Sequence, residues 1–307
     1  MKILFIASGN HGKVTSVVGN QAEALMSDGV EVDWFFFKGK GLTGYLKNVR
    51  PLRQYLRKHH YNAIHVHYSF SAFAASLAGA RPLIVSLMGS DVKAKGIYKF
   101  LIRLFAVCFR WKAIIVKSND MYRVLGIKRS VVIPNGVNLE RFFPMDKKKC
   151  QMKVRWDSSK KHILFPANAI DQEKDYPLAE AAFERMRSLE SEKIELHPFV
   201  KTPNTETPYW YNAADVVLMT SKWEGSPNVI KEAMACSRPI VAVNVGDIAE
   251  RTKGLEGCYV ATTREPEELA LLLQKAMAFS QTKGRERIIA DGLDAHEINK
   301  KLIALYK

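Results

Sequence analysis

Short apolar runs alternate with amphipathic segments along the whole of this 307-residue chain. The apolar runs predict buried strands, and the segments between them predict helices that cover a parallel sheet on both faces. We therefore expect an α/β protein with doubly wound, Rossmann-like sheets. The predicted strands are 2–7, 30–37, 63–67, 82–87, 113–117, 130–134, 162–167, 193–199, 215–219, 239–243 and 257–261. The predicted helices are about 14–28, 51–60, 71–79, 96–110, 118–126, 176–189, 227–236, 265–279 and 283–306.

The segment 144–160 is polar and basic and lacks apolar periodicity, so we predict that it links two domains. The first would cover 1–150 and the second 151–290, with 291–307 as a C-terminal helix that packs back toward the first. Sheets of this type bind ligands beyond the carboxyl ends of their strands, so we expect a ligand between the two lobes.

The four cysteines lie far apart and include no CxxC pair. Their spacing predicts neither a disulfide framework nor a zinc site, and a reducing cytoplasm is the expected compartment. The apolar run at the N-terminus is too short for a signal peptide and is expected to be the first buried strand.

One segment, residues 220–235 (TSKWEGSPNVIKEAMA), joins a loop to the start of a helix directly after a predicted strand. Pro227 suits a first helical turn, where no N–H is needed, and Ser226 is a suitable N-cap. The free N–H groups of such a turn, together with the helix dipole, bind anions. Glu224 and Glu232 add carboxylates that accept hydrogen bonds from hydroxyl groups. The segment therefore predicts a site for a diphosphate ligand that carries sugar hydroxyls.

Seven residues separate Glu224 from Glu232, and the run EGSPNVIKEAMACSRPIVAV resembles the E-x7-E signature of retaining glycosyltransferases of family 4. IPNGVN at 133–138, with RFFP at 141–144, is similar to the family's crossing between domains. NAADV at 212–216 and GSD at 89–91 resemble two further family motifs. The resemblance covers most of the chain and implies the GT-B fold, in which two Rossmann-like domains face a central cleft.

By this resemblance, Glu232 binds the ribose hydroxyls, Glu224 binds the transferred sugar and takes part in catalysis, and Lys174 neutralises the diphosphate. Asn168 stands nearest to the position where the family has an arginine. The backbone from Gly225 to Val229 would meet the sugar and the diphosphate. The predicted donor-binding residues are Asn168, Lys174, Glu224, Gly225, Ser226, Pro227, Asn228, Val229 and Glu232.

The other half of the site is expected from the first domain. In the family, the loop after the first strand borders the diphosphate and the acceptor; here it is Gly9, Asn10, His11 and Gly12. Its glycines could equally serve tight strand–helix packing. His67 matches a family histidine that faces the reaction centre, and we expect it to be a catalytic residue that orients the donor sugar; a core histidine is the alternative.

Two other enzyme classes are disfavoured. The run GNHGK at 9–13 has too few residues between its glycines for a phosphate loop, and it is not a GxGxxG motif. The sequence therefore does not indicate an ATPase or a dehydrogenase. It also contains no DxD motif, which agrees with sugar transfer that needs no metal.

Positive charge is concentrated in the first half of the chain. Residues 1–150 carry 24 Lys and Arg against 8 Asp and Glu, whereas the rest of the chain is close to neutral. Basic stripes at 95–112 and 50–57 predict helices that rest on an anionic membrane, and a core helix with a solvated basic edge is the alternative. Nucleic acid is not expected, because no reading motif accompanies the charge.

Together these patterns predict a retaining glycosyltransferase without a metal or other cofactor. It would move a sugar from a nucleotide sugar, with UDP as the expected carrier and GDP as the alternative, to a lipid-linked acceptor. We expect a role in cell-envelope or capsular polysaccharide assembly, in the cytoplasm and peripheral on the inner face of the cell membrane. The alternatives are a soluble acceptor and a catalytically silent, sugar-nucleotide-binding partner subunit.

Overall fold

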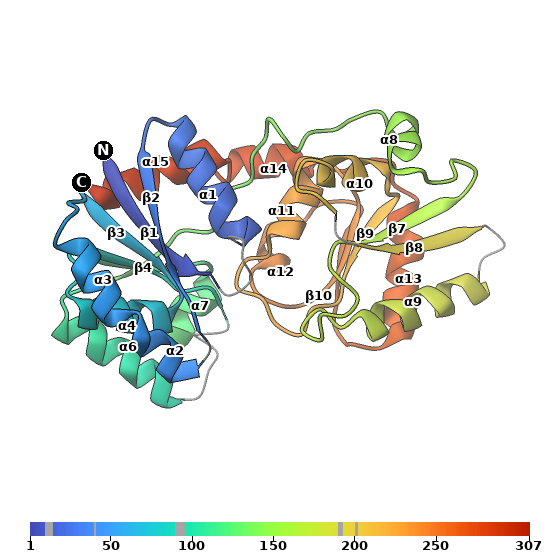
Figure 1. Cartoon of the computed structure of the whole chain (residues 1–307). Coiled ribbons are helices and arrows are strands. Elements are labelled where there is room, and N and C mark those ends of the chain that lie inside the picture. The colour runs from blue at the N-terminus through green and yellow to red at the C-terminus, as the bar shows by residue number, and fades with distance from the viewer. Residues whose placement is uncertain (10–14, 40, 90–95, 190–192, 200–201) are drawn as a thin grey trace. The chain divides into compact units, whose positions relative to one another are not determined.

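The computed structural model describes residues 1–9, 15–39, 41–89, 96–189, 193–199 and 202–307. These residues form two compact units, which we call unit 1 and unit 2 (Figure 1). Unit 1 comprises Met1–Gly136 and Ala295–Lys307, and unit 2 comprises Val137–Asp294. Each unit is an α/β domain with a parallel sheet, as the alternation of strands and helices predicts.

Unit 1 is built around a parallel sheet with helices on both faces. Its strands are β1 (Lys2–Ser8), β2 (Glu31–Phe37), β3 (Ala63–His67), β4 (Leu83–Ser86), β5 (Ala113–Val116) and β6 (Ser130–Val132). Its helices are α1 (Ser16–Ser27), α2 (Gly41–Lys47), α3 (Val49–Leu56), α4 (Ser69–Ala78), α6 (Gly96–Cys108), α7 (Asn119–Leu125) and α15 (Ala295–Tyr306). Residues from α3, α4, α6 and α7 share one apolar core with the sheet, whereas α1 and α15 pack together on its opposite face (Figure 1).

The strand order of unit 1 is β2-β1-β3-β4-β5-β6. β2 pairs with one edge of β1, and β3 pairs with the other edge. The strand order therefore reverses between β1 and β3. Gly9 follows β1, and His67 ends β3. Both residues therefore lie at the reversal point, where doubly wound sheets bind their ligands.

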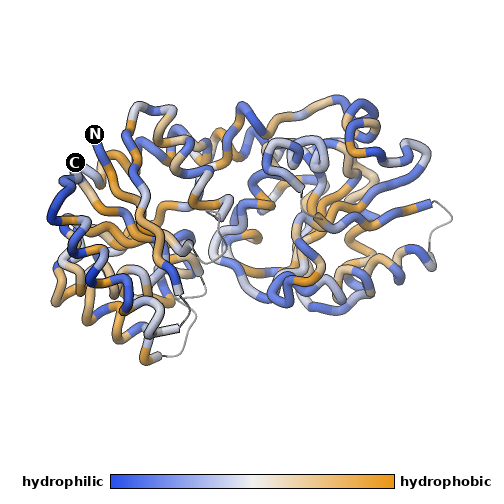
Figure 2. Tube along the Cα trace, viewed as in Figure 1, coloured by the Kyte–Doolittle hydropathy of each residue, from blue (hydrophilic) through white to orange (hydrophobic). Residues whose placement is uncertain are grey.

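Unit 2 repeats this construction. Its strands are β7 (Lys161–Phe165), β8 (Ile194–Pro198), β9 (Val216–Met219), β10 (Ile240–Val243) and β11 (Cys258–Ala261). Its helices are α8 (Lys147–Val154), α9 (Tyr176–Leu189), α10 (Thr207–Ala213), α11 (Asn228–Ala235), α12 (Ile248–Thr252), α13 (Pro266–Met277) and α14 (Gly284–Ala290). The strand order is β11-β10-β9-β7-β8, so it reverses between β7 and β9. Figure 2 shows the strands of both units mostly in the orange of hydrophobic residues.

The predicted linker over 144–160 is wrong, because it contains the helix α8. Asp146 caps this helix by accepting a hydrogen bond from the backbone N–H of Lys149 at 2.8 Å. Cys150 and Gln151 are buried, and the Gln151 side chain donates to the carbonyl of Ala213 in α10. The buried face of α8 includes a polar glutamine, so apolar periodicity did not reveal it.

The domain boundaries also differ from the predicted ones. The chain passes from unit 1 to unit 2 at Gly136 rather than at residue 150, and returns to unit 1 at Ala295. The single helix predicted over 283–306 is two helices, α14 and α15. Gly292, with φ of +60°, lies between them in a backbone conformation that ends a helix readily.

Candidate functional site

The strand order of unit 2 brings together the loops that follow β7 and β9. The backbone N–H of Lys222 donates to the carbonyl of Glu173 at 2.9 Å. The Thr220 hydroxyl is 3.0 Å from the carbonyl of Lys174 and 2.8 Å from that of Asp175. Predicted donor residues that are 50 positions apart in the sequence are therefore held on adjoining loops.

Lys174 and Glu224 form the contact at the centre of this arrangement. The Lys174 Nζ atom is 2.6 Å from Glu224 Oε1, and the side chains are 31% and 17% exposed. The cation predicted to neutralise a diphosphate and the carboxylate predicted to meet sugar hydroxyls therefore lie side by side, and both side chains are partly exposed. Asn168 stabilises the turn that leads to Lys174, because its side-chain oxygen accepts from the backbone N–H of Ile170 at 3.1 Å.

Arg264 braces the same two loops, although the sequence patterns did not indicate it. Its guanidinium donates to the carbonyls of Thr220 and Ser221 at 2.7 and 3.1 Å. It also pairs with the Asp175 carboxylate at 2.7 Å. Arg264 lies 40 residues beyond Glu224 and belongs to no recognised motif, so only the fold reveals its role.

The start of α11 differs in detail from the prediction. Pro227 is the N-cap residue, not part of the first turn, and no side chain caps the helix. The Ser226 hydroxyl donates instead to Asp247 Oδ2 at 2.8 Å. The side-chain oxygen of Asn228 is buried without a hydrogen-bond partner. The first-turn N–H groups therefore lack a competing side-chain cap, which is the arrangement that binds an anion.

A buried polar network holds the loop between Glu224 and α11. Lys231 is 1% exposed, and its ammonium is 3.2 Å from the Ser226 hydroxyl. Burial lowers the pKa of Lys231 to about 8, while the nearby Asp247 carboxylate favours its charged form. Asp247 also accepts from Arg251 at 3.0 Å. This network was not predicted, because Asp247 and Arg251 come from the segment that follows the neighbouring strand β10.

Gly246 allows that next loop to approach the predicted donor loop closely. Its φ is +63°, and a Cβ atom there would lie 2.8 Å from the carbonyl oxygen of Gly225. Any larger residue would clash with backbone rather than with a flexible side chain. The conformation of Gly225 and Ser226 is therefore set by backbone contact as well as by the Lys231–Asp247 network.

Glu232 receives a hydrogen bond from a buried tyrosine. The Tyr211 hydroxyl donates to Glu232 Oε2 at 2.7 Å, and Tyr211 is fully buried. Burial raises the pKa of Glu232, and it raises that of Tyr211 well above its ordinary value. Tyr211 therefore stays protonated and fixes the orientation of the Glu232 carboxylate. Tyr211 directly precedes the NAADV motif, a signal that could have identified it.

Hydrogen bonds connect the NAADV and RFFP segments of unit 2 with each other and with α11. Asn212 of NAADV accepts from the backbone N–H of Met145 at 2.9 Å and donates to the carbonyl of Phe143 at 3.0 Å. Arg285 donates to the carbonyls of Phe142 and Ala235 at 2.7 and 3.3 Å. The segment around RFFP is thus bonded to the end of the helix that carries Glu232.

The predicted residues of unit 1 are only partly described. Asn10, His11 and Gly12 lie outside the described residues. The backbone N–H of Gly9 donates to the carbonyl of Phe37, and an added Cβ would lie 2.8 Å from the Cβ of Phe36. Close strand packing alone therefore requires a glycine at this position.

His67 is buried at the carboxyl end of β3. It is 4% exposed, stacks on His65 at 4.4 Å between ring centroids, and has a buried Nε2 atom without a hydrogen-bond partner. Burial and the charge of Lys117 lower its pKa to about 3, so the ring is neutral. His65, in contrast, is bonded to Ser86 and Tyr306 at 2.8 and 2.7 Å. The role of His67 toward a donor sugar stays a prediction.

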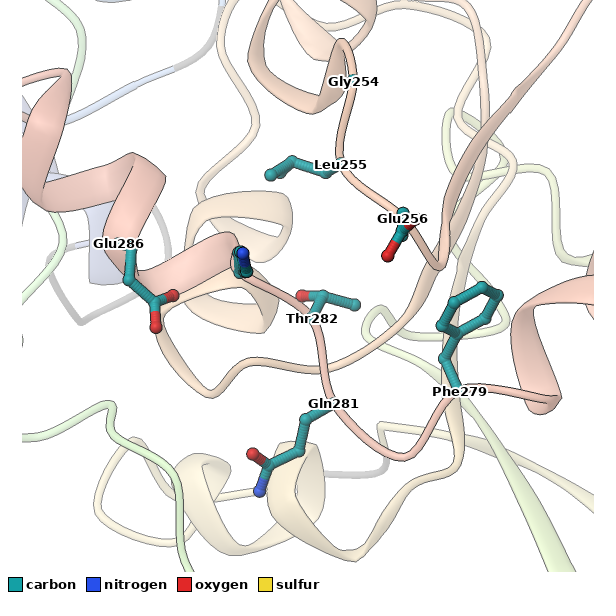
Figure 3. A pocket seen from close by; sticks show the side chains of 8 residues that line it. Gly254, Leu255, Glu256, Phe279, Gln281, Thr282 and Glu286 are labelled. Carbon is teal, nitrogen blue, oxygen red and sulfur yellow. The ribbon is translucent and has the colours of Figure 1, made fainter.

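A depression of about 510 Å³ opens on unit 2 between the end of α13 and the start of α14 (Figure 3). Leu255, Phe279, Thr282 and Glu286 are among the residues that line it. None of the predicted donor residues lines this depression. The candidate site is therefore the Lys174–Glu224 region and not this hollow.

Comparison with known families agrees with this geometry. A family model described as "Glycosyltransferase Family 4" matches residues 14–141, and one described as "Glycosyl transferases group 1" matches residues 173–278. The chain is a family 4-like glycosyltransferase. The second match contains Lys174, Glu224 and Glu232.

A curated relative of this family 4-like glycosyltransferase is TuaC of Bacillus subtilis (strain 168), whose name assigns it to teichuronic acid biosynthesis. The two are 23% identical over 209 residues, which is 61% of this chain and 54% of TuaC. The match thus spans about half the length of this relative.

Solved glycosyltransferases share the fold. Sucrose-phosphate synthase from Thermosynechococcus elongatus matches with a TM-score of 0.81 at 18% identity, over 99% of this chain and 98% of that one. HepE from Anabaena, in complex with UDP and glucose, matches with a TM-score of 0.72 at 18% identity, over 99% and 98%. The family 4-like glycosyltransferase therefore has the GT-B fold. Among its described residues, no helix is long and apolar enough to cross a membrane.

Proposed function

We propose that this protein transfers a sugar, with retention of anomeric configuration, from a nucleotide diphosphate sugar to an acceptor. The observation that carries the proposal is the Lys174–Glu224 pair, 2.6 Å apart, on the adjoining loops that follow β7 and β9. A diphosphate needs a cation and N–H donors, and a sugar needs hydrogen-bond acceptors. The HepE structures with UDP and with UDP-glucose support uridine diphosphate as the carrier.

In this proposal, each predicted site residue has a distinct task. Lys174 and the first turn of α11 stabilise the negative charge that develops on the leaving diphosphate, so no metal ion is required. Glu224 holds the hydroxyls of the transferred sugar once the diphosphate has replaced it as the partner of Lys174. Glu232, oriented by Tyr211, holds the ribose hydroxyls. His67 orients the donor sugar, and the loop from Gly9 to Gly12 borders the acceptor.

Nucleotide release by the purified full chain tests this proposal. Incubation with a panel of UDP-sugars and GDP-sugars is expected to give slow hydrolysis of one donor. Proton NMR would identify the anomer of the sugar that is released initially. This anomer is expected to have the same configuration as the donor. Tight binding without release would favour a silent partner subunit instead. Initial release of the opposite anomer would contradict retention.

We further propose that the acceptor is lipid-linked and that the protein acts on the cytoplasmic face of the cell membrane in polysaccharide assembly. The name of TuaC supports such a role. The surface of α6 supports the location, because four large apolar side chains are exposed along one stripe: Ile97, Phe100, Leu104 and Val107, at 59%, 59%, 42% and 67%.

Basic side chains flank this apolar stripe. Arg103 and Arg110 are exposed beside it. The helix α3 carries the exposed Arg50 and Arg53, and Arg57 follows its end; α3 packs against α4, which in turn packs against α6 (Figure 1). A merely solvated helix edge would not expose large apolar residues at such spacing. Apolar residues that enter the lipid beside basic residues that meet anionic headgroups are typical of an interfacial helix.

Replacing both Phe100 and Val107 with aspartate is therefore expected to abolish sedimentation with vesicles of mixed anionic and neutral phospholipid. Nucleotide release in the absence of lipid should be unaffected. Leu271→Asp is the control, since Leu271 is 53% exposed on α13 of unit 2. Equal sedimentation of the double variant and the parent at low salt would contradict membrane docking through α6.

A further inference from the structure

Three metal-ligating side chains lie together on unit 2, among residues that the donor site does not use. His162 is on β7, and Glu195 and His197 are on the neighbouring strand β8. In the parallel register His162 is opposite Glu195, and Leu164 is opposite His197. Because side chains alternate along a strand, all three point to the same face of the sheet. In the described part of the chain, this is the one group of three such residues whose ligand atoms lie within 4.8 Å of one another.

The spacing of their ligand atoms suits a small divalent ion. His162 Nδ1 is 3.0 Å from His197 Nε2, and Glu195 Oε2 is 3.4 Å from His197 Nε2 and 3.8 Å from His162 Nδ1. Zinc bonds of about 2.0–2.2 Å in tetrahedral geometry place ligand atoms about 3.3–3.6 Å apart. The observed triangle brackets this range, so small side-chain adjustments would complete the coordination.

Neighbouring groups fix the orientation of each ligand. The carbonyl of Asp157 is 2.9 Å from His162 Nε2, and a carbonyl can only accept. The proton of His162 is therefore on Nε2, and the lone pair of Nδ1 faces the cluster. An imidazole that donates its other N–H to a carbonyl is the usual arrangement of a metal-bound histidine.

The other two ligands are held in a similar way. Lys160 is hydrogen-bonded to Glu195 Oε1, which leaves Oε2 as the oxygen that faces the histidines. Trp156 stacks on the His197 ring, with 3.8 Å between centroids and 17° between planes. These contacts restrict the side chains before any ion binds, which lowers the entropy lost on binding.

An ion could reach the cluster from solvent. β8 is the edge strand of its sheet. A depression of about 620 Å³ opens beside this strand, lined in part by Lys160, Phe183, Glu195 and His197. The His197 and Glu195 side chains are 18% and 34% exposed, whereas His162 is buried. The cluster thus combines one buried anchor with two ligands that a hydrated ion can approach.

We propose that His162, Glu195 and His197 bind one zinc-like divalent cation, with water completing its coordination. The ion would cross-link the edge strand β8 to β7 and so stabilise unit 2. It would be a structural ion and not a participant in sugar transfer, since none of its ligands belongs to the Lys174–Glu224 site.

Titration of the metal-stripped full chain with Zn²⁺, in competition with a chromophoric chelator, tests this proposal. We expect one equivalent to bind, a change in the fluorescence of Trp156, and a higher thermal unfolding midpoint. His197→Ala should weaken binding more than about 100-fold, because loss of an outer-shell partner alone costs about 10–100-fold. His60→Ala, which removes an exposed histidine of unit 1, should bind like the parent.

Glu195→Gln provides a second variant that keeps the size of the side chain and removes its charge. It too should weaken Zn²⁺ binding, and replacement of Zn²⁺ by Co²⁺ in the parent should give the visible absorption of a tetrahedral site. Absence of saturable binding by the parent would overturn the proposal. So would unchanged affinity in either folded ligand variant.

Discussion

The Lys174→Met variant is expected to turn over donor about 10²–10³-fold more slowly than the parent, because removing one preorganised donor to a developing negative charge costs about that much. Methionine keeps most of the side-chain volume and removes the ammonium that is 2.6 Å from Glu224. The measurement is nucleotide release at saturating donor. The loss should appear in kcat more than in KM, since the charge on the diphosphate grows as the sugar departs.

Lys222→Met is the matched control for this variant. Lys222 is an exposed lysine two residues before Glu224 on the same loop. Neither substitution should change stability by more than about 1 kcal/mol, since partly exposed ion pairs contribute little. Equal losses in both variants would point to a general effect of loop charge, and turnover by Lys174→Met within threefold of the parent would contradict the proposed role.

Glu232→Gln is expected to weaken nucleotide binding about 10–100-fold without destabilising the protein. Hydrogen bonds to a charged group contribute about 1.5–3 kcal/mol, and the variant removes the charge that the ribose hydroxyls would meet. Isothermal titration with the nucleotide diphosphate measures the loss. Glu256→Gln, at an exposed position of unit 2, is the control and should bind like the parent.

The stability of Glu232→Gln separates a binding role from a structural one. Burial raises the pKa of Glu232, so the folded state holds its proton more tightly than the unfolded chain does. The stabilisation from this group is present below the ordinary glutamate pKa and is lost as the pH rises, so at neutral pH the ionised carboxylate costs stability. The glutamine variant should therefore unfold at the same temperature as the parent or higher. A lower unfolding temperature at neutral pH would indicate that Glu232 serves the fold.

The strands and most helices could be predicted from the sequence, because most strands are apolar runs between turn residues. α8 and α10 could not be predicted in this way. Both lie over one face of the unit 2 sheet and pack against each other, and their buried faces include Gln151 and Asn212, so the apolar period is weak. The buried Asn212 side chain is hydrogen-bonded to the backbone of the 143–145 segment, and no local sequence pattern reveals these partners.

The candidate site shows the same division between local and distant information. Lys174, Glu224 and Glu232 were predicted from motifs, and the reversal of strand order between β7 and β9 explains why two of them meet. The N-cap role predicted for Ser226 was wrong, because Asp247 from the following loop takes its hydroxyl. Lys231 and Arg264 gain their positions from tertiary contacts, so their roles follow only from the fold, whereas Tyr211 directly precedes the NAADV motif.

The central claim is that Lys174, Glu224 and Glu232 hold a nucleotide diphosphate sugar, and calorimetric titration of the full chain with UDP tests it most directly. The parent should bind one equivalent, and uridine without its diphosphate should bind far more weakly. Lys174→Met should lose most of that preference for the diphosphate, whereas Glu232→Gln should keep it and bind both ligands less tightly. Failure of the parent to bind UDP or GDP, or binding that neither variant changes, would contradict the account.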